Sequence, residues 1–157
     1  FEQFKKENNS YSFTTNHIKI PVCYELDFGI DLEKIAKEKN CSVKEIIEIH
    51  TSKTYQVFCV GFLPGFAYMG KVDEKIQMPR HAKPRPLVSA GSVGIAGAQT
   101  GIYPKNSPGG WQIIGRTPKT IFDPVQLALF APSDMVSFYP ISLDEFNSLQ
   151  KETNHVI

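Results

Sequence analysis

Most of the glycine and proline in this sequence falls between Gly61 and Gly110, where only short apolar runs separate them. Proline cannot donate to a strand ladder and glycine weakens the interior of a strand, so this stretch is unsuited to long regular elements. Many short strands joined by ordered loops suit it instead, as in a closed or nearly closed barrel. The middle of the chain is therefore predicted to be β-rich.

The chain before this centre is predicted to contain one strand and two helices. Residues 17–24 alternate apolar and polar, which is typical of a half-buried strand, and Pro21 favours an edge position or a bulge. Asp31 is expected to cap a helix over residues 32–39. Ser42 and Glu45 then form the pattern of a capping box, in which the side chain of each residue accepts a hydrogen bond from the backbone amide of the other.

The remaining elements complete a mainly β domain with short helices. Four segments carry a strand pattern: 54–60, 111–114, 120–122 and 135–139. Ser142 and Glu145 repeat the capping box and start a last helix, on which Leu143, Phe146 and Leu149 are expected to face inward. With helices at the ends and strands between them, the fold class is α+β, built around a barrel.

Composition excludes several classes of protein. The 157 residues suffice for one domain, and 17 Lys and Arg against 16 Asp and Glu leave a formal charge of +1, which gives no electrostatic footprint for nucleic acid. No apolar run reaches the roughly 20 residues needed to span a membrane. The three cysteines lack metal-ligand spacing, so no metal site is predicted, and a reduced, cytoplasmic protein is expected.

The start of the chain suggests a domain boundary. The sequence begins at Phe1 rather than Met, and the first strand pattern appears only at His17. We interpret residues 1–16 as the remnant of an upstream domain or a linker, and residues 17–157 as the folded domain.

Two of the Gly- and Pro-rich segments are candidates for a functional site on their residues alone. The loop 61–70, with Pro64 and Gly65 at its centre, fixes a tight path lined by aromatic side chains, although a loop that only packs on the core would look the same. In residues 79–86, prolines stiffen the backbone around Arg80 and Arg85. A rigid pair of guanidinium groups suits a carboxylate or phosphate, and a solvated basic loop is the alternative.

Two later segments are further candidates. Residues 91–104 are dense in glycine, which permits close approach of a ligand, and Gln99 and Tyr103 supply neutral hydrogen-bonding groups there. In residues 107–111 the successive amides of a Gly-Gly turn can form an anion-binding nest. Trp111, the only tryptophan, is expected to be either a pocket wall or a core anchor.

The sequence lacks the common catalytic signatures. It contains no G-x-x-x-x-G-K-[ST] loop for ATP, no G-x-S-x-G elbow and no H-E-x-x-H zinc motif. His17, His81 and His155 have no evident partners. His50 lies at a predicted helix end, where imidazolium is favoured, so it is expected to be a proton-transfer group or a structural cap.

Several motifs in order resemble one known family, from about Ile18 to Ile141. The matching stretches are Ile20–Tyr24, Asp31–Leu32, Ile49–Thr51, Gly61–Tyr68, Ala90–Val93, Gly101–Pro104 and Ser107–Thr117. They resemble the allophanate hydrolase subunit 1 family. Its members include the B subunit of bacterial 5-oxoprolinase and an inhibitor of a sporulation histidine kinase, and it is similar to part of the carboxyltransferase region of urea carboxylase.

The resemblance implies a cyclophilin-like β-barrel and a role in a hydrolase complex. The B subunit would act with the A and C subunits, the latter a second cyclophilin-like chain, to open 5-oxoproline to glutamate with ATP used by the complex and no cofactor bound by this chain alone. Binding to a histidine kinase is the alternative, and carboxyl transfer to a urea-type substrate is the third. No nucleic-acid or membrane partner is implied.

The resemblance also carries site roles onto this sequence. The expected catalytic residues are His50, Arg85 and Gln99. Arg85 is expected to bind an anion, with Arg80 as the second choice for that role. Gln99 is expected to hold a carbonyl oxygen and His50 to transfer a proton. The expected substrate-binding residues are Pro64, Gly65, Arg80, Tyr103, Ser107, Gly109, Gly110 and Trp111. If these residues form one site, their segments must meet on a single concave surface.

Overall fold

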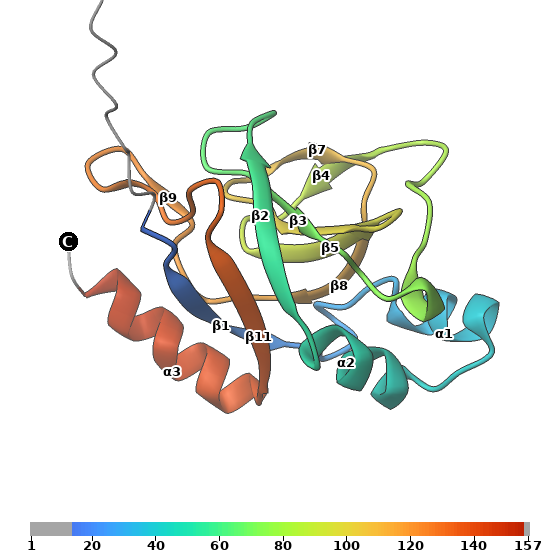
Figure 1. Cartoon of the computed structure of the whole chain (residues 1–157). Coiled ribbons are helices and arrows are strands. Elements are labelled where there is room, and N and C mark those ends of the chain that lie inside the picture. Colours follow the sequence, from blue (N-terminus) through green and yellow to red (C-terminus); the bar gives the residue numbers. More distant parts are fainter. Residues whose placement is uncertain (1–13, 156–157) are drawn as a thin grey trace, which may run out of the picture.

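The computed structural model describes residues 14–155, which form a closed seven-stranded barrel with three helices packed on its outside (Figure 1). Around the barrel the order is β1 (His17–Cys23), β11 (Met135–Ile141), β2 (Thr54–Val60), β3 (Ala67–Gly70), β6 (Gln99–Ile102), β5 (Ser92–Ala96) and β8 (Gln112–Arg116). The expected fold, mainly β with short helices and built on a barrel, is confirmed. The predicted domain boundary after residue 16 stays a prediction, because residues 1–13 lie outside the described part of the chain.

Shorter elements complete the fold. Two-stranded sheets pair β4 (Arg85–Val88) with β7 (Ser107–Gly109) and β9 (Phe122–Asp123) with β10 (Leu127–Ala128). Within the described residues the helices are α1 (Leu32–Lys39), α2 (Val43–Thr51) and α3 (Leu143–Asn154), together with the 3₁₀ turn η1 (Glu74–Ile76). Helix α3 lies along β1 and β11 on one side of the barrel, whereas α1 and α2 lie together on another side, where α2 contacts β11 (Figure 1). No helix in residues 14–155 combines the length and apolar character that crossing a membrane requires.

The predicted helix starts are confirmed at all three positions, and the predicted side-chain caps at two of them. Ser42 and Ser142 each accept a bond from the amide of the glutamate three residues on, and that glutamate bonds back to the serine amide. Asp31 does occupy the N-cap of α1, but its side chain makes no capping bond. The predicted capping role of the Asp31 carboxylate is therefore wrong, because other donors hold it.

One prediction about strand position holds in part, and one about a helix face needs correction. Strand β1 pairs with β11 along its whole length without a bulge and closes the barrel against β8, but within residues 14–155 only Cys23 and Arg116 pair there. Pro21 therefore lies in a barrel strand whose β8 side is unpaired at that residue. On α3, Phe146 is buried but Leu143 is 44% exposed. Each residue of a helix is turned 100° from the last, so Leu143 lies about 60° away from the stripe centred on Phe146.

The buried apolar residues form two clusters. The larger fills the barrel and the space under the helices, with Ile20, Tyr55, Met69 and Ile95 among its fully buried members. The smaller is largely aromatic and includes Phe66, Tyr103 and Trp111 together with Val88 of β4. This second cluster lies beside the Gly- and Pro-rich segments, and it forms the floor of the candidate site.

Candidate functional site

A cavity of about 300 Å³ lies where the four Gly- and Pro-rich segments meet. Five of the predicted site residues line it: Arg80, Tyr103, Gly109, Gly110 and Trp111. They come from the 79–86 segment, the end of β6, the end of β7 and the turn into β8. The structure thus brings residues up to 31 positions apart to one concave surface.

Five further residues line the same cavity and were not among those predicted: Phe62, Tyr68, His81, Pro84 and Pro108. All five lie in segments that the sequence already marked as unusual. Phe62 carries the clearest structural signal, since it is 69% exposed and has a left-handed backbone with φ of 68°. Bulky residues rarely adopt that conformation, and the rare cases concentrate at functional sites.

Aromatic rings form the apolar wall of the cavity around Phe66. The Phe66 ring meets Tyr103 and Trp111 edge to face, with centroids 5.4 and 5.2 Å apart, and lies 4.9 Å from Tyr68. Phe62 extends the cluster outward at 5.9 Å. Such pairs restrain one another's orientation, so the wall is rigid where it is buried and open at Phe62.

The polar side chains of the cavity include the Arg80 guanidinium, the phenols of Tyr68 and Tyr103 and the imidazole of His81. Arg80 is exposed and has no ion-pair partner within residues 14–155. Burial raises the pKa of Tyr103, although a hydrogen bond from the Trp111 amide and the charge of Arg80 act in the opposite direction. The phenol is therefore neutral and keeps its proton for donation.

The close packing of Tyr103 also explains the first glycine of the Gly109-Gly110 turn. A β-carbon built on Gly109 would overlap the Tyr103 hydroxyl and ring, whereas one on Gly110 would meet only ordinary contacts, the nearest at 3.6 Å. The turn passes over the phenol at a distance that only glycine allows. Gly110 then accepts a bond from the His81 amide at 2.7 Å, which joins this turn to the 79–86 segment.

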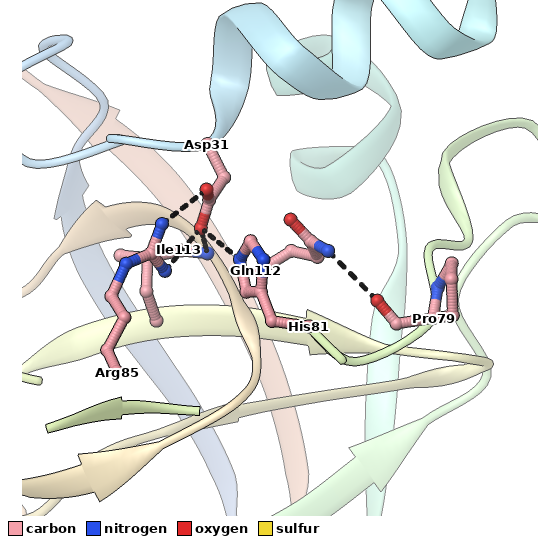
Figure 2. Close-up of polar contacts among 6 residues, drawn as sticks. All are labelled: Asp31, Pro79, His81, Arg85, Gln112 and Ile113. Atoms are coloured by element: carbon pink, nitrogen blue, oxygen red, sulfur yellow. Dashed lines mark hydrogen bonds and ion pairs between the residues drawn. The ribbon is translucent and has the colours of Figure 1, made fainter. Parts of the chain in front are cut away.

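Arg85 does not line this cavity, contrary to its expected role as the anion-binding residue. Its two terminal nitrogens bond the two carboxylate oxygens of Asp31 at 2.8 and 2.6 Å (Figure 2). A bidentate pair of this kind occupies the donors that a ligand would need. Arg85 instead borders a separate cavity of about 190 Å³ with Arg116. The sequence shows no sign of this pairing, because the partners are 54 residues apart.

The Asp31 carboxylate also bonds two other donors. The Ile113 amide approaches Oδ2 at 2.7 Å and the His81 Nε2 at 3.2 Å (Figure 2). Burial alone would raise the pKa of Asp31, but the bonds from Arg85, Ile113 and His81 outweigh it and hold that pKa below its usual value. His81, which had no evident partner in the sequence, is thus fixed by an ionised carboxylate.

His50 lies inside the barrel and not in the cavity. Thr100 donates its hydroxyl proton to the Gly94 carbonyl, so His50 Nε2 must donate to the Thr100 oxygen, at 3.0 Å. The other ring nitrogen, Nδ1, then accepts from the Tyr24 hydroxyl at 2.8 Å. Burial lowers the pKa of His50 to about 3, so the ring is neutral, and the imidazolium expected at a helix end is absent.

The other predicted site residues also lie outside the cavity wall. Gln99 begins β6 and is paired in the ladder with Ala96, and Ser107 is buried with its hydroxyl bonded to the neighbouring Pro108 carbonyl. Pro64 and Gly65 form the tip of the β2–β3 loop. Gly65 has φ of 85° and packs directly on Phe122 of β9, so its role is to let the loop backbone take this path. Within residues 14–155, no three His, Cys, Asp or Glu side chains are grouped so as to hold a metal ion.

A family model described as "Carboxyltransferase domain, subdomain C and D" matches residues 2–131. The chain belongs to this family. The resemblance seen in the sequence is confirmed, since relatives at high identity across most of the chain include the B subunit of bacterial 5-oxoprolinase that it named.

Two bacterial relatives of this family member show how much of a longer protein it spans. The 5-oxoprolinase B subunit of Bacillus subtilis is 43% identical over 155 residues, covering 98% of this chain and 65% of that protein. The corresponding B subunit of Haemophilus influenzae is 45% identical over 139 residues, covering 87% of this chain and again 65% of the relative. The chain therefore spans less than two thirds of the length of these relatives.

Solved structures of similar chains share the fold. A conserved uncharacterized protein from Pyrococcus horikoshii superposes with a TM-score of 0.80 at 52% identity, over 83% of this chain and 62% of that one. The urea carboxylase of Kluyveromyces lactis superposes with a TM-score of 0.76 over 88% of this chain and 15% of its own, at 22% identity. The second likeness concerns the barrel fold alone.

Proposed function

We propose that this chain is part of the B subunit of a 5-oxoprolinase, which opens 5-oxoproline to glutamate together with the A and C subunits at the expense of ATP. The observation that carries the proposal is 43–45% identity to the B subunit of three bacteria across most of this chain. The cavity supports it, because a small ligand with a carboxylate matches one free guanidinium beside an aromatic wall.

Arg80 takes the anion-binding role first assigned to Arg85. Its guanidinium has no protein carboxylate as partner in the described chain, so it binds the carboxylate of 5-oxoproline. The five-membered ring packs against Tyr68 and Trp111, and the neutral Tyr103 hydroxyl donates to the lactam oxygen. A donor aimed at that oxygen stabilises the charge that develops when the carbonyl carbon is attacked.

His50 cannot transfer a proton to a ligand in the cavity from its buried position, so it has no catalytic role in this proposal. The remaining requirements of lactam opening, ATP above all, are assigned to the rest of the complex, since the sequence has no G-x-x-x-x-G-K-[ST] loop. The exposed Phe62 leaves one side of the cavity open. The C subunit would complete the site from that side.

The test uses the complex reconstituted with the A and C subunits. Arg80→Ala should raise the KM for 5-oxoproline about 10- to 100-fold, because a hydrogen-bonded charge pair is lost. Arg80→Lys should fall between this and the unsubstituted complex, since it keeps the charge but loses the planar fork. Lys37→Ala, an exposed residue in the last turn of α1, is the matched control and should leave KM unchanged.

Two results would count against the proposal. If the complex opens 5-oxoproline equally well when this chain is omitted, the chain has no part in the reaction. If Arg80→Ala leaves KM unchanged, the cavity is not the substrate site. The sequence left two alternatives, docking on a histidine kinase and carboxyl transfer to a urea-type substrate. Both stay predictions, and the same variants can be used to test each of them.

A further inference from the structure

Asp31 occupies the N-cap of α1 without capping it. A capping aspartate normally accepts a bond from an amide in the first turn, and none is made here. The carboxylate instead turns away from the helix toward β8 and the 79–86 segment (Figure 2). Its side chain is only 4% exposed. A buried carboxylate that gives up its local partner must serve a contact elsewhere.

Four hydrogen bonds hold this carboxylate, and they come from three parts of the chain. Two come from Arg85 at the start of β4, one from the Ile113 amide of β8 and one from the His81 ring. Asp31 therefore links both ends of the segment 81–85 to strand β8 of the barrel. We call this set of four residues the Asp31 latch.

The cation of the cavity, Arg80, directly precedes the latch residue His81, and both of its neighbours in the chain make hydrogen bonds. Arg80 follows Pro79, whose carbonyl accepts a bond from the side-chain Nε2 of the buried Gln112 at 3.0 Å. It precedes His81, whose backbone amide donates to the Gly110 carbonyl at 2.7 Å. Figure 2 shows the contact between Gln112 and Pro79 on one side of the barrel, next to the Asp31 cluster. The backbone of Arg80 is thus fixed on both sides, while its side chain is free to meet a ligand.

Charge balance gives the latch a second effect on the cavity. Asp31 and Arg85 neutralise each other, so Arg80 presents the unopposed positive charge beside His81. Without Arg85, the Asp31 carboxylate would lie one side chain away from the cavity as an uncompensated negative charge. An anionic ligand would then be repelled where it should be bound.

We propose that Asp31 is a positioning residue which, through Arg85 and His81, fixes Arg80 and thereby sets the affinity of the cavity for an anionic substrate. This inference rests on the proposed function, in which Arg80 binds the substrate carboxylate. It places a determinant of substrate binding on a helix cap that does not line the cavity. It also gives Arg85 a different role from the direct contact expected from the sequence.

A double-mutant cycle in the reconstituted complex tests whether Asp31 acts through Arg80. Asp31→Asn removes the charge and keeps the shape, and it should raise the KM for 5-oxoproline about tenfold or more with little change in kcat. In the Arg80→Ala background the same substitution should change KM by no more than about twofold, since its effect is already lost. Equal changes in both backgrounds would overturn the proposal.

A second latch variant covers the case in which Asp31→Asn does not fold. Arg85→Lys keeps the charge balance but cannot make the two-point contact, so it should raise KM in the same direction, again only when Arg80 is present. Asp144→Asn, an exposed carboxylate in the first turn of α3, is the matched control and should leave KM unchanged. A KM unchanged by Arg85→Lys in a folded complex contradicts the latch.

Hydrogen exchange in the full chain tests the latch apart from any activity. In the unsubstituted chain the His81 amide is bonded to the Gly110 carbonyl. In Asp31→Asn this amide should exchange faster, while the amides within α2 keep their exchange rates. Unchanged exchange at His81 would overturn the latch. If the complex with the unsubstituted chain does not open 5-oxoproline, the proposed function fails instead, and faster exchange at His81 would still support the latch.

Discussion

Gly109 and Gly110 are neighbours in one turn, but only the first lacks room for a side chain. The phenol of Tyr103 fills the space that a β-carbon on Gly109 would take, and Tyr103 is almost fully buried, so it cannot move aside. Around Gly110 the nearest atoms are at ordinary contact distance. Neither glycine has a positive φ, so steric overlap alone separates them.

Substituting the two glycines should therefore give different results. Gly109→Ala should lower the free energy of unfolding by about 1–3 kcal/mol, the usual cost of overpacking a rigid site. Gly110→Ala should change it by about 0.5 kcal/mol or less. Urea denaturation of both variants measures the difference, and equal free energies of unfolding would contradict the contact between Gly109 and Tyr103.

At the scale of elements, α3 is held to the barrel mainly through Phe146. Its ring lies 4.7 Å from that of Phe28, and the Arg116 guanidinium of β8 stands over both rings at 5.6 and 6.0 Å. Leu143, one turn earlier, is 44% exposed. Cation–π contacts and burial thus concentrate the attachment of the helix at one side chain.

This arrangement predicts unequal effects of two apolar truncations on the same helix. Phe146→Ala should lower the free energy of unfolding by about 3–5 kcal/mol, because a buried ring is replaced by a cavity. Leu143→Ala should cost about 0.5 kcal/mol or less, as for other exposed positions. Thermal and chemical unfolding measure both, and a large loss in Leu143→Ala would place the buried stripe of α3 elsewhere.

For the whole molecule, His50 couples stability to pH in the mildly acidic range. It lies at the barrel centre between Tyr24, Thr100, Tyr55 and Phe138, where burial lowers its pKa to about 3. Tyr24 and Tyr55 ionise only in alkali, and burial raises their pKa values further, so neither phenol titrates in acid. The unfolded chain, with an ordinary histidine pKa near 6.5, binds a proton that the folded chain does not.

Stability should therefore fall as pH drops below about 6.5, by up to about 1.4 kcal/mol per pH unit, until the pKa near 3 is reached. Above pH 6.5 this contribution is fully present. His50→Gln should be less stable at pH 7, because the bonds to Tyr24 and Thr100 are disturbed, but its stability should change less between about pH 6.5 and 4.5. Parallel pH profiles in denaturant unfolding would contradict this role of His50.

The sequence by itself determined the local features of this protein. The two capping boxes, the short strands of the centre and the β-rich class all depend on neighbours within a few residues, and the structure confirms them. The four Gly- and Pro-rich segments were also recognisable, because such backbones are needed wherever chains approach closely. Arg80, Tyr103 and the Gly109-Gly110 turn were named from these segments, and all of them line one cavity.

Only the tertiary structure decided which polar groups face that cavity. Arg85 and Asp31 are 54 residues apart, and nothing local distinguishes the paired guanidinium of Arg85 from that of Arg80, which has no ion-pair partner in the described part of the chain. Likewise, His50 at a helix end looked able to hold a charge until the barrel closed around it. Closure of the barrel sets burial and long-range pairing together, and these two quantities determine which side chains remain available for a ligand.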